Sequence, residues 1–179
     1  CISHLTIESD DPIPLELRPL MAEALRRGDE LHNRNAAATS MLAERLAVGF
    51  ARTGVAPDLQ ERAFGLMAAN PQFFVPCSLA LSRLALRAAE GVEGSTLVTA
   101  CGANGTTCGI KVAGLPDRWF TAPAELPVGV LLPGFGPGDV GPGCGDSLLV
   151  ECYGLGASFL PAAPALWPLL GVDGPRARE

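Results

Sequence analysis

The stretch from residue 94 to residue 123 constrains the fold most, because it predicts a β-hairpin. Two runs rich in apolar and β-branched residues, 95–101 and 106–113, flank a short segment that contains Asn104 and Gly105. An Asn-Gly pair between such runs favours a tight hairpin turn, because both central positions of a primed turn need positive φ. We therefore expect two antiparallel strands here.

The expected turn, residues 102–105 with Thr106 after it, also offers successive backbone N–H groups that can hold an anion. Turn geometry alone explains the same residues equally simply. The segment has neither a phosphate-loop lysine nor a GxGxxG pattern, so it does not predict a nucleotide site.

A polar, aromatic loop at residues 114–121 follows the hairpin and contains Arg118, Trp119 and Thr121. Binding sites often lie on loops that a rigid scaffold holds, so this loop is a candidate site. The simpler alternative is a surface ion pair between Asp117 and Arg118.

Residues 14–91 predict a helical half, because apolar residues recur there at steps of three and four. After a strand-like tail at residues 1–12, we expect one helix to begin at Pro14 and end at Gly28. The other expected helices span 36–53, 58–69 and 70–90.

Residues 94–172 predict a half built of strands and loops. After the hairpin we expect a strand at 128–132, a short helix through Glu151 that Asp146 or Ser147 caps, and a helix at 155–170 broken near Pro161 and Pro164. The fold class is α+β, in one domain over 1–172, with a small β-hairpin or sheet layer against the helical half, a C-terminal broken helix and a disordered tail at 173–179.

Composition excludes several classes of protein. With 13 basic and 19 acidic residues the formal charge is −6, which argues against a nucleic-acid surface. No run of about eighteen uncharged apolar residues predicts a membrane span. The chain starts at Cys1 without an initiator Met, so we expect a fragment of a longer chain. The six cysteines lack zinc-site spacing, so we expect reduced thiols in a cytoplasmic protein, with no metal and no cofactor.

A dense polar block at residues 28–35 lies between two expected helices. Helix capping explains one or two of its side chains but leaves an arginine between two asparagines unexplained. The functional interpretation is that Arg34 grips a carboxylate or phosphate with two parallel hydrogen bonds, while Asn33 or Asn35 orients it. His32 alone is weak evidence for catalysis.

The glycine-rich segment 134–147 predicts a loop that cradles a ligand, or alternatively a plain long connection. Asp139 or Asp146 would supply its polar contact. Glu151 lies five residues after Asp146, and two carboxylates so placed suit acid–base work.

Taken together, these blocks resemble the YlbE-like family of bacterial proteins, whose genes accompany that of the FdrA protein. The resemblance covers about residues 28–165 and is carried by Gly28–Asn35 with Ala37–Thr39, Asn70–Phe74, Asn104–Thr106, Asp117–Ala124, Gly145–Ser147, Glu151 and Gly154–Gly156. Two segments depart from the family pattern by being less polar, namely residues 101–103 and 141–144. These departures leave open a divergent substrate or a lost activity.

The resemblance implies a subunit of a carbamoyltransferase that acts on small carboxylates, of the type that interconverts oxalurate plus phosphate with oxamate plus carbamoyl phosphate in purine and allantoin catabolism. We assign catalytic roles to five residues: Arg34 and Arg118 as anion clamps, Asn35 as a donor, and Asp146 and Glu151 to orient groups or manage protons. The expected substrate-binding residues are His32, Asn33, Asn104, Gly105, Thr106, Trp119, Thr121 and Ser147. The alternative is a non-catalytic assembly or ligand-binding subunit that partners an FdrA-like protein, and a third is an inactive fragment.

Overall fold

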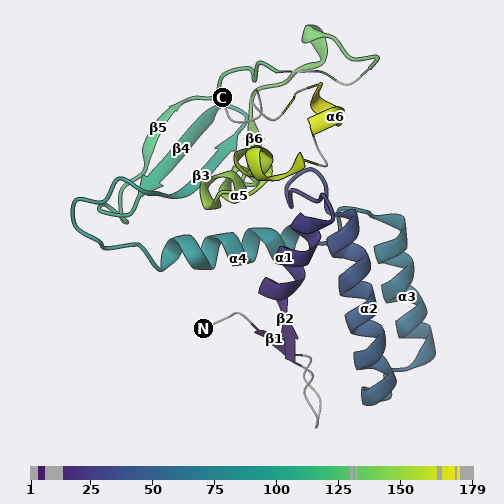
Figure 1. Cartoon of the computed structure of the whole chain (residues 1–179). Helices are drawn as coiled ribbons and strands as arrows, with labels where there is room; N and C mark the ends of the chain where they lie inside the picture. The colour runs from purple at the N-terminus through teal and green to yellow at the C-terminus, as the bar shows by residue number, and fades with distance from the viewer. Residues whose placement is uncertain are drawn as a thin grey trace. The chain divides into compact units, whose positions relative to one another are not determined.

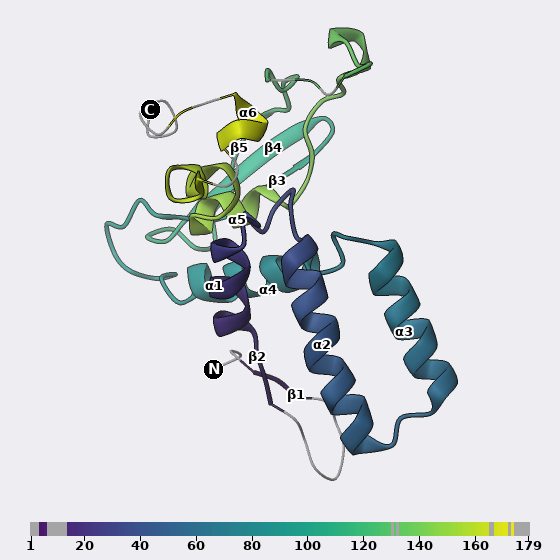
Figure 2. The ribbon, with the colours of Figure 1, turned by 45° about the vertical axis from the view of Figure 1, so that its right-hand side comes forward.

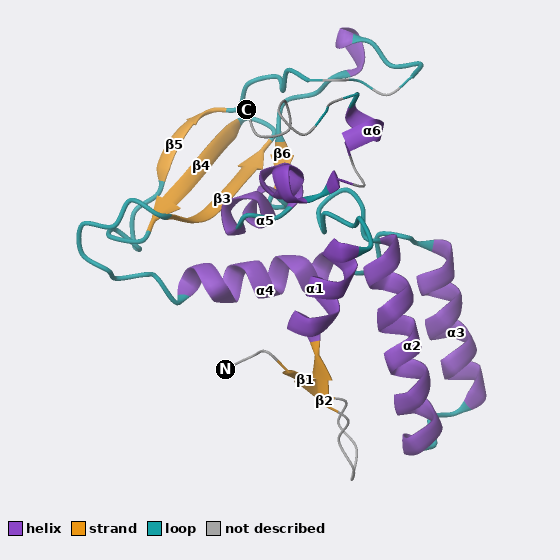
Figure 3. Cartoon of the chain, viewed as in Figure 1, coloured by secondary structure: helices purple, strands orange, loops and turns teal. Residues whose placement is uncertain are grey.

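The computed structural model describes residues 4–6, 14–129, 131, 133–164, 167–171 and 173. These residues form helices and an antiparallel sheet, so the predicted α+β class is confirmed (Figure 3). The chain divides into a first unit, Cys1–Leu81 with Gly154–Glu179, and a second unit, Ser82–Tyr153. The single domain over residues 1–172 stays a prediction.

The first unit contains three successive helices, α1 (Leu17–Arg26), α2 (Ala36–Thr53) and α3 (Pro57–Ala69), and the start of α4 (Val75–Arg87). Figure 1 shows α2 and α3 side by side, and the rings of Phe50 and Phe64 pack at 5.5 Å between centroids. The α1 helix buries one face because its apolar residues recur at helical spacing. That face comprises Leu17, Leu20, Met21 and Ala24.

Two helices begin later than the sequence predicts. Pro14 belongs to β2 (Pro14–Glu16), which pairs antiparallel with β1 (His4–Thr6), so α1 begins only at Leu17. The α4 helix begins at Val75, because the preceding residues form a turn in which Asn70 Oδ1 accepts a hydrogen bond from the N–H of Gln72 at 3.0 Å.

The second unit is built on a four-stranded antiparallel sheet in the order β5-β4-β3-β6 (Figure 3). Figure 2 shows its strands β3 and β4 from a second angle. The predicted hairpin is present as β3 (Val98–Asn104) and β4 (Thr107–Val112). Its turn is shorter than predicted, because Gly102 pairs with Gly109 inside the ladder and only Gly105 and Thr106 lie outside the strands. Asn104 Oδ1 accepts hydrogen bonds from the N–H groups of Thr106 and Thr107 and closes this turn.

The remaining elements differ in part from the expectation. Part of the predicted polar loop forms an edge strand, β5 (Phe120–Pro123), and β6 (Cys144–Gly145) pairs with β3. Of the predicted strand at 128–132, Val130 and Leu132 lie outside the described residues, and the other three are not in a strand. The predicted short helix is α5 (Leu148–Tyr153), which packs on β3. The 3-10 turn η1 (Pro137–Asp139) lies between β5 and β6 along the chain.

The predicted broken helix at 155–170 is a 3-10 helix, η2 (Gly156–Ala162), followed by α6 (Trp167–Leu170). No helix among the described residues has both the length and the apolar character needed to cross a membrane. Among the described residues, the cysteines at 77, 101, 108, 144 and 152 are free thiols.

Gly114 lies where the chain leaves the hairpin, and a Cβ added there would come within 2.9 Å of the Ser95 carbonyl oxygen and 3.2 Å of the Val92 carbonyl oxygen. Both obstacles are backbone atoms, so we expect Gly114→Ala to lower the free energy of unfolding by about 1–3 kcal/mol. Urea denaturation measures the change. Gly65→Ala is the matched control: its Cβ meets nothing within 4 Å on exposed helix α3, so it should stabilise by about 0.5–1 kcal/mol. Equal effects of the two substitutions would contradict this packing account.

Candidate functional site

The polar loop between α1 and α2 buries both of its carboxylates. Asp29 is 1% exposed and Glu30 7% exposed. Leu31 between Glu30 and His32 is fully buried and has a φ of 66°, a left-handed conformation that costs energy for a residue with a Cβ. Burial of the Leu31 side chain holds this strained backbone in place, so the loop is a built structure and not a loose connection.

Asp29 anchors the start of α2 from outside the helix. Its Oδ2 accepts a hydrogen bond from the N–H of Ala38 at 2.8 Å, while the N-cap residue Asn35 makes no side-chain capping bond. A carboxylate at this helix N-terminus satisfies a free N–H group and interacts favourably with the helix dipole. Burial raises the pKa of Asp29, and the Ala38 hydrogen bond and the Arg34 charge oppose that rise.

Glu30 holds the loop closed. Its Oε1 accepts hydrogen bonds from the N–H groups of Asn33 and Arg34, and its backbone carbonyl accepts one from the N–H of Gly156 at 2.7 Å. Its other carboxylate oxygen, Oε2, is buried and has no hydrogen-bond partner among the described residues. Burial raises the pKa of Glu30, and the two backbone hydrogen bonds counteract it.

Arg34 is the exposed cation of this loop. Its Nε lies 3.7 Å from Asp29 Oδ1, and the side chain is 48% exposed. Within the described part of the chain, no hydrogen bond or ion pair involves its two terminal nitrogens, so they can grip an anion in parallel. The buried Asp29 carboxylate thus lies beside the Nε of an arginine whose side chain is half exposed.

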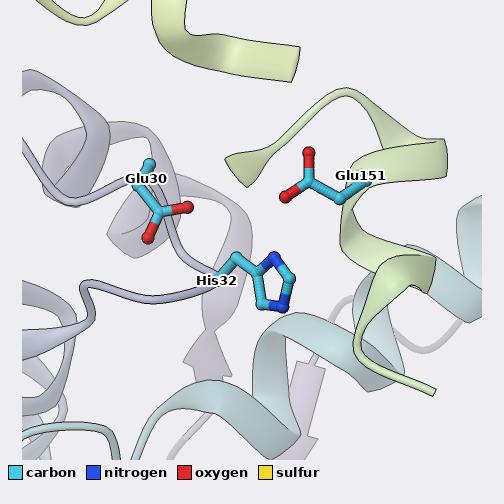
Figure 4. Close-up of side chains that lie close together, drawn as sticks. All are labelled: Glu30, His32 and Glu151. Atoms are coloured by element: carbon cyan, nitrogen blue, oxygen red, sulfur yellow. The ribbon is translucent and has the colours of Figure 1, made fainter. Parts of the chain in front are cut away.

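The neighbours of Arg34 divide into buried and exposed. Asn35 is 1% exposed and its Nδ2 donates to the carbonyl of His32 at 3.0 Å, which makes it part of the loop framework. Asn33 is exposed, and its carbonyl accepts a hydrogen bond from Gln72 Nε2 at 2.9 Å. His32 is half-buried, and Figure 4 shows its imidazole and the Glu30 carboxylate extending from this loop.

In the second unit, the structure brings two of the predicted segments together at the tip of the hairpin. Gly145 pairs with Ala103, and the N–H of Gly105 donates to the Gly143 carbonyl at 3.0 Å. The predicted residues Asn104, Gly105 and Thr106 therefore lie beside the segment that leads into Asp146 and Ser147. Thr106 Oγ1 donates to Asn104 Oδ1 at 2.9 Å, so turn geometry already uses that oxygen and that hydroxyl.

Three other predicted residues of this unit, Arg118, Trp119 and Thr121, lie at its β5 edge, away from the hairpin tip. Arg118 lies 4.6 Å from the centre of the Phe120 ring, and Lys111 lies 5.3 Å from the centre of the Trp119 ring, in cation–π contacts. Thr121 pairs with Gly109, and a Cβ added to Gly109 would come within 3.1 Å of the Trp119 ring. Glu151 lies on α5 and is half-buried. Arg118 and Trp119 are exposed, so this edge presents cations beside aromatic rings.

Sequence reasoning chose Arg34, Asn35 and His32 but missed Asp29 and Glu30, which fix their positions. The available signal was that two adjacent acids directly follow the glycine that ends a helix. The roles assigned to the predicted site residues stay predictions.

Comparison with known proteins gives the family. A family model described as "Oxamate carbamoyltransferase subunit AllG" matches residues 4–147. The chain is 40% identical over 157 residues to "Uncharacterized protein YahG" of Escherichia coli K12, covering 88% of this chain and 33% of that protein. It is 33% identical over 163 residues to "Oxamate carbamoyltransferase subunit AllG" of the same organism, covering 91% of this chain and 39% of that protein.

A solved structure is also similar, that of a conserved protein of unknown function from Enterococcus faecalis V583. It has a TM-score of 0.82 and 34% identity, over 93% of this chain and 40% of that chain. This chain thus spans between a third and two fifths of the length of these three relatives. The resemblance inferred from the residues is confirmed, and the chain belongs to the family of the oxamate carbamoyltransferase subunit AllG.

Proposed function

We propose that this chain is part of a carbamoyltransferase subunit that acts on a small carboxylate of the oxamate type, in the cytoplasm and in purine or allantoin catabolism. The family supports the reaction class. The observation that carries the proposal is Arg34, which a buried carboxylate orients while its terminal nitrogens stay open to an anion. Both substrates of such a reaction, oxamate and carbamoyl phosphate, are anions.

The reaction requires positioning more than covalent help. The amide nitrogen of oxamate attacks the carbonyl carbon of carbamoyl phosphate, a C–N bond forms, the C–O bond to phosphate breaks, and the nitrogen loses a proton. The products are oxalurate and inorganic phosphate. A protein accelerates such a step by holding the two anions together and by stabilising the charge that develops on the carbonyl oxygen and on the departing phosphate.

Within this proposal, Arg34 and Arg118 bind the carboxylate or phosphate groups. Asn33, the Nδ2 of Asn104, Trp119, Thr121 and Ser147 contact substrate, and Asp146 and Glu151 orient groups or accept the proton. Asn35 acts as a positioning residue, since its Nδ2 already holds the His32 carbonyl. Gly105 and Thr106 shape the turn that presents Asn104.

A second candidate function, an assembly subunit for an FdrA-like protein, is supported by exposed apolar residues in the second unit. Val128 is fully exposed and helps to line a hollow of about 240 Å³ together with Leu126, Leu131 and Val140, and Phe135 is 63% exposed. Large apolar side chains gathered on a surface commonly mark a protein interface. Both functions are compatible in one multi-subunit enzyme.

A label-transfer assay tests the proposal. The purified protein, alone and with its co-purified partner, is incubated with carbamoyl phosphate carrying a labelled carbonyl carbon and with oxamate. We expect labelled oxalurate and an equal amount of phosphate. Partner binding with no labelled product, and with no binding of either anion, would reject the transferase role and leave the assembly role.

A further inference from the structure

Glu30 and His32 form a pair of potential metal ligands on the loop between α1 and α2. A carboxylate oxygen of Glu30 and an imidazole nitrogen of His32 lie within 4.8 Å of each other. Two ligands of one ion with bonds of about 2.1 Å are separated by roughly 3–4 Å, so a small side-chain adjustment suffices. Figure 4 shows both side chains extending from the loop.

The second observation is independent of that proximity and concerns hydrogen bonding. Glu30 Oε2 and Asn35 Oδ1 are buried acceptors without a partner among the described residues. Buried polar atoms are almost always satisfied, so each such atom requires an explanation. Glu30 Oε2 belongs to a carboxylate, and a carboxylate favours a cation as its missing partner over an anion.

The backbone explains why these two side chains meet. Leu31, between them, has a φ of 66° and is fully buried. Strained backbone of this kind persists only where the surrounding structure holds it, here through the Leu31 N–H donated to the Arg34 carbonyl at 3.0 Å. Glu30 Oε1 is already occupied by two backbone N–H groups, which fixes the carboxylate and leaves Oε2 as the ligand atom.

We propose that Glu30 and His32 bind a divalent transition-metal ion, with the remaining positions filled by water or by an anionic ligand. A mixed carboxylate and imidazole set suits Zn²⁺ or Mn²⁺. The sequence predicted no metal, but that argument concerned the spacing of cysteines, which belong to a different class of ligand. This proposal does not depend on the transferase proposal, and the measured metal content of the protein decides it.

The test uses purified, untagged protein stripped with a chelator and dialysed against ZnCl₂ or MnCl₂. Bound metal is measured by inductively coupled plasma mass spectrometry, and Tm is measured with and without metal. We expect about one equivalent of one of the two ions, and a Tm that rises with metal concentration because the ion binds only the folded state. Wild-type protein that retains no metal and shows no Tm shift would overturn the proposal.

Three variants decide whether the ion lies at this loop. Glu30→Gln keeps an oxygen for the Asn33 and Arg34 N–H groups but removes the charge, and His32→Gln removes the imidazole; each should weaken metal affinity at least tenfold. Glu61→Gln removes an exposed carboxylate on α3 and should leave affinity unchanged. Circular dichroism confirms folding of each variant. Equal affinity in all three variants, or an equal loss in Glu61→Gln, would mean that the metal binds elsewhere and would overturn the proposal.

Discussion

Replacing Phe74 by alanine is expected to lower the free energy of unfolding by about 3–5 kcal/mol, a large part of the stability of a unit this size. Phe74 is fully buried at the turn that leads into α4. Its N–H donates to Thr39 Oγ1 at 3.2 Å, and the same hydroxyl donates to the Pro71 carbonyl at 3.0 Å. Loss of the ring therefore opens a cavity beside a buried hydrogen-bonded link between α2 and this turn.

Chemical denaturation with urea measures the effect of Phe74→Ala. Leu66→Ala is the control, because Leu66 is 64% exposed on α3 and its truncation should change stability by less than about 0.5 kcal/mol. A loss below about 1 kcal/mol for Phe74→Ala would contradict its place in the core.

Replacing Arg34 by alanine is expected to lower kcat/KM for carbamoyl transfer by roughly 10²–10³, the usual cost of removing one preorganised donor from developing negative charge. The fold should survive, since the side chain is half exposed and its ion-pair distance to Asp29 is 3.7 Å. Arg34→Lys should recover little, because an ammonium group lacks the planar two-point geometry of a guanidinium. Arg45→Ala, an exposed arginine on α2, is the control. Wild-type kcat/KM in Arg34→Ala would remove Arg34 from the site.

The sequence predicted the features that depend on neighbouring residues. Asn104–Gly105 between β-forming runs gave the hairpin, and the apolar spacing of α2 gave a helix with the observed bounds, closed by Gly54 at a φ of 65°. These signals depend only on neighbouring residues, so the hairpin and the helix that they predict are present in the structure. The family resemblance likewise rested on ordered blocks such as residues 28–35, and the family model that matches residues 4–147 confirms it.

Features set by distant contacts were not predicted. Pro14 is compatible with a helix start, yet pairing of β2 with β1 keeps it extended. Phe120 to Pro123 has few strand signals, and it forms β5 because β4 offers a free edge. Asp29 caps α2 from nine residues before Ala38, a separation at which no capping rule applies.

The burial of Asp29 and Glu30 was likewise not predicted, because it depends on contacts that form only in the folded chain. Charged residues in a loop are normally solvated, so sequence alone assigns them to the surface. Here the N–H groups of Ala38, Asn33 and Arg34 replace water around the two carboxylates. Only the folded loop, with Leu31 in its left-handed conformation, brings those donors within reach.

Titration calorimetry of the purified protein with oxamate and with carbamoyl phosphate tests most directly whether the loop between α1 and α2 provides an anion site. We predict that at least one of the two anions binds the wild type and that Arg34→Ala weakens this binding at least tenfold, while Arg45→Ala leaves it unchanged. Equal binding by the wild type and Arg34→Ala, or no heat of binding from either anion with the co-purified partner present, would contradict the account.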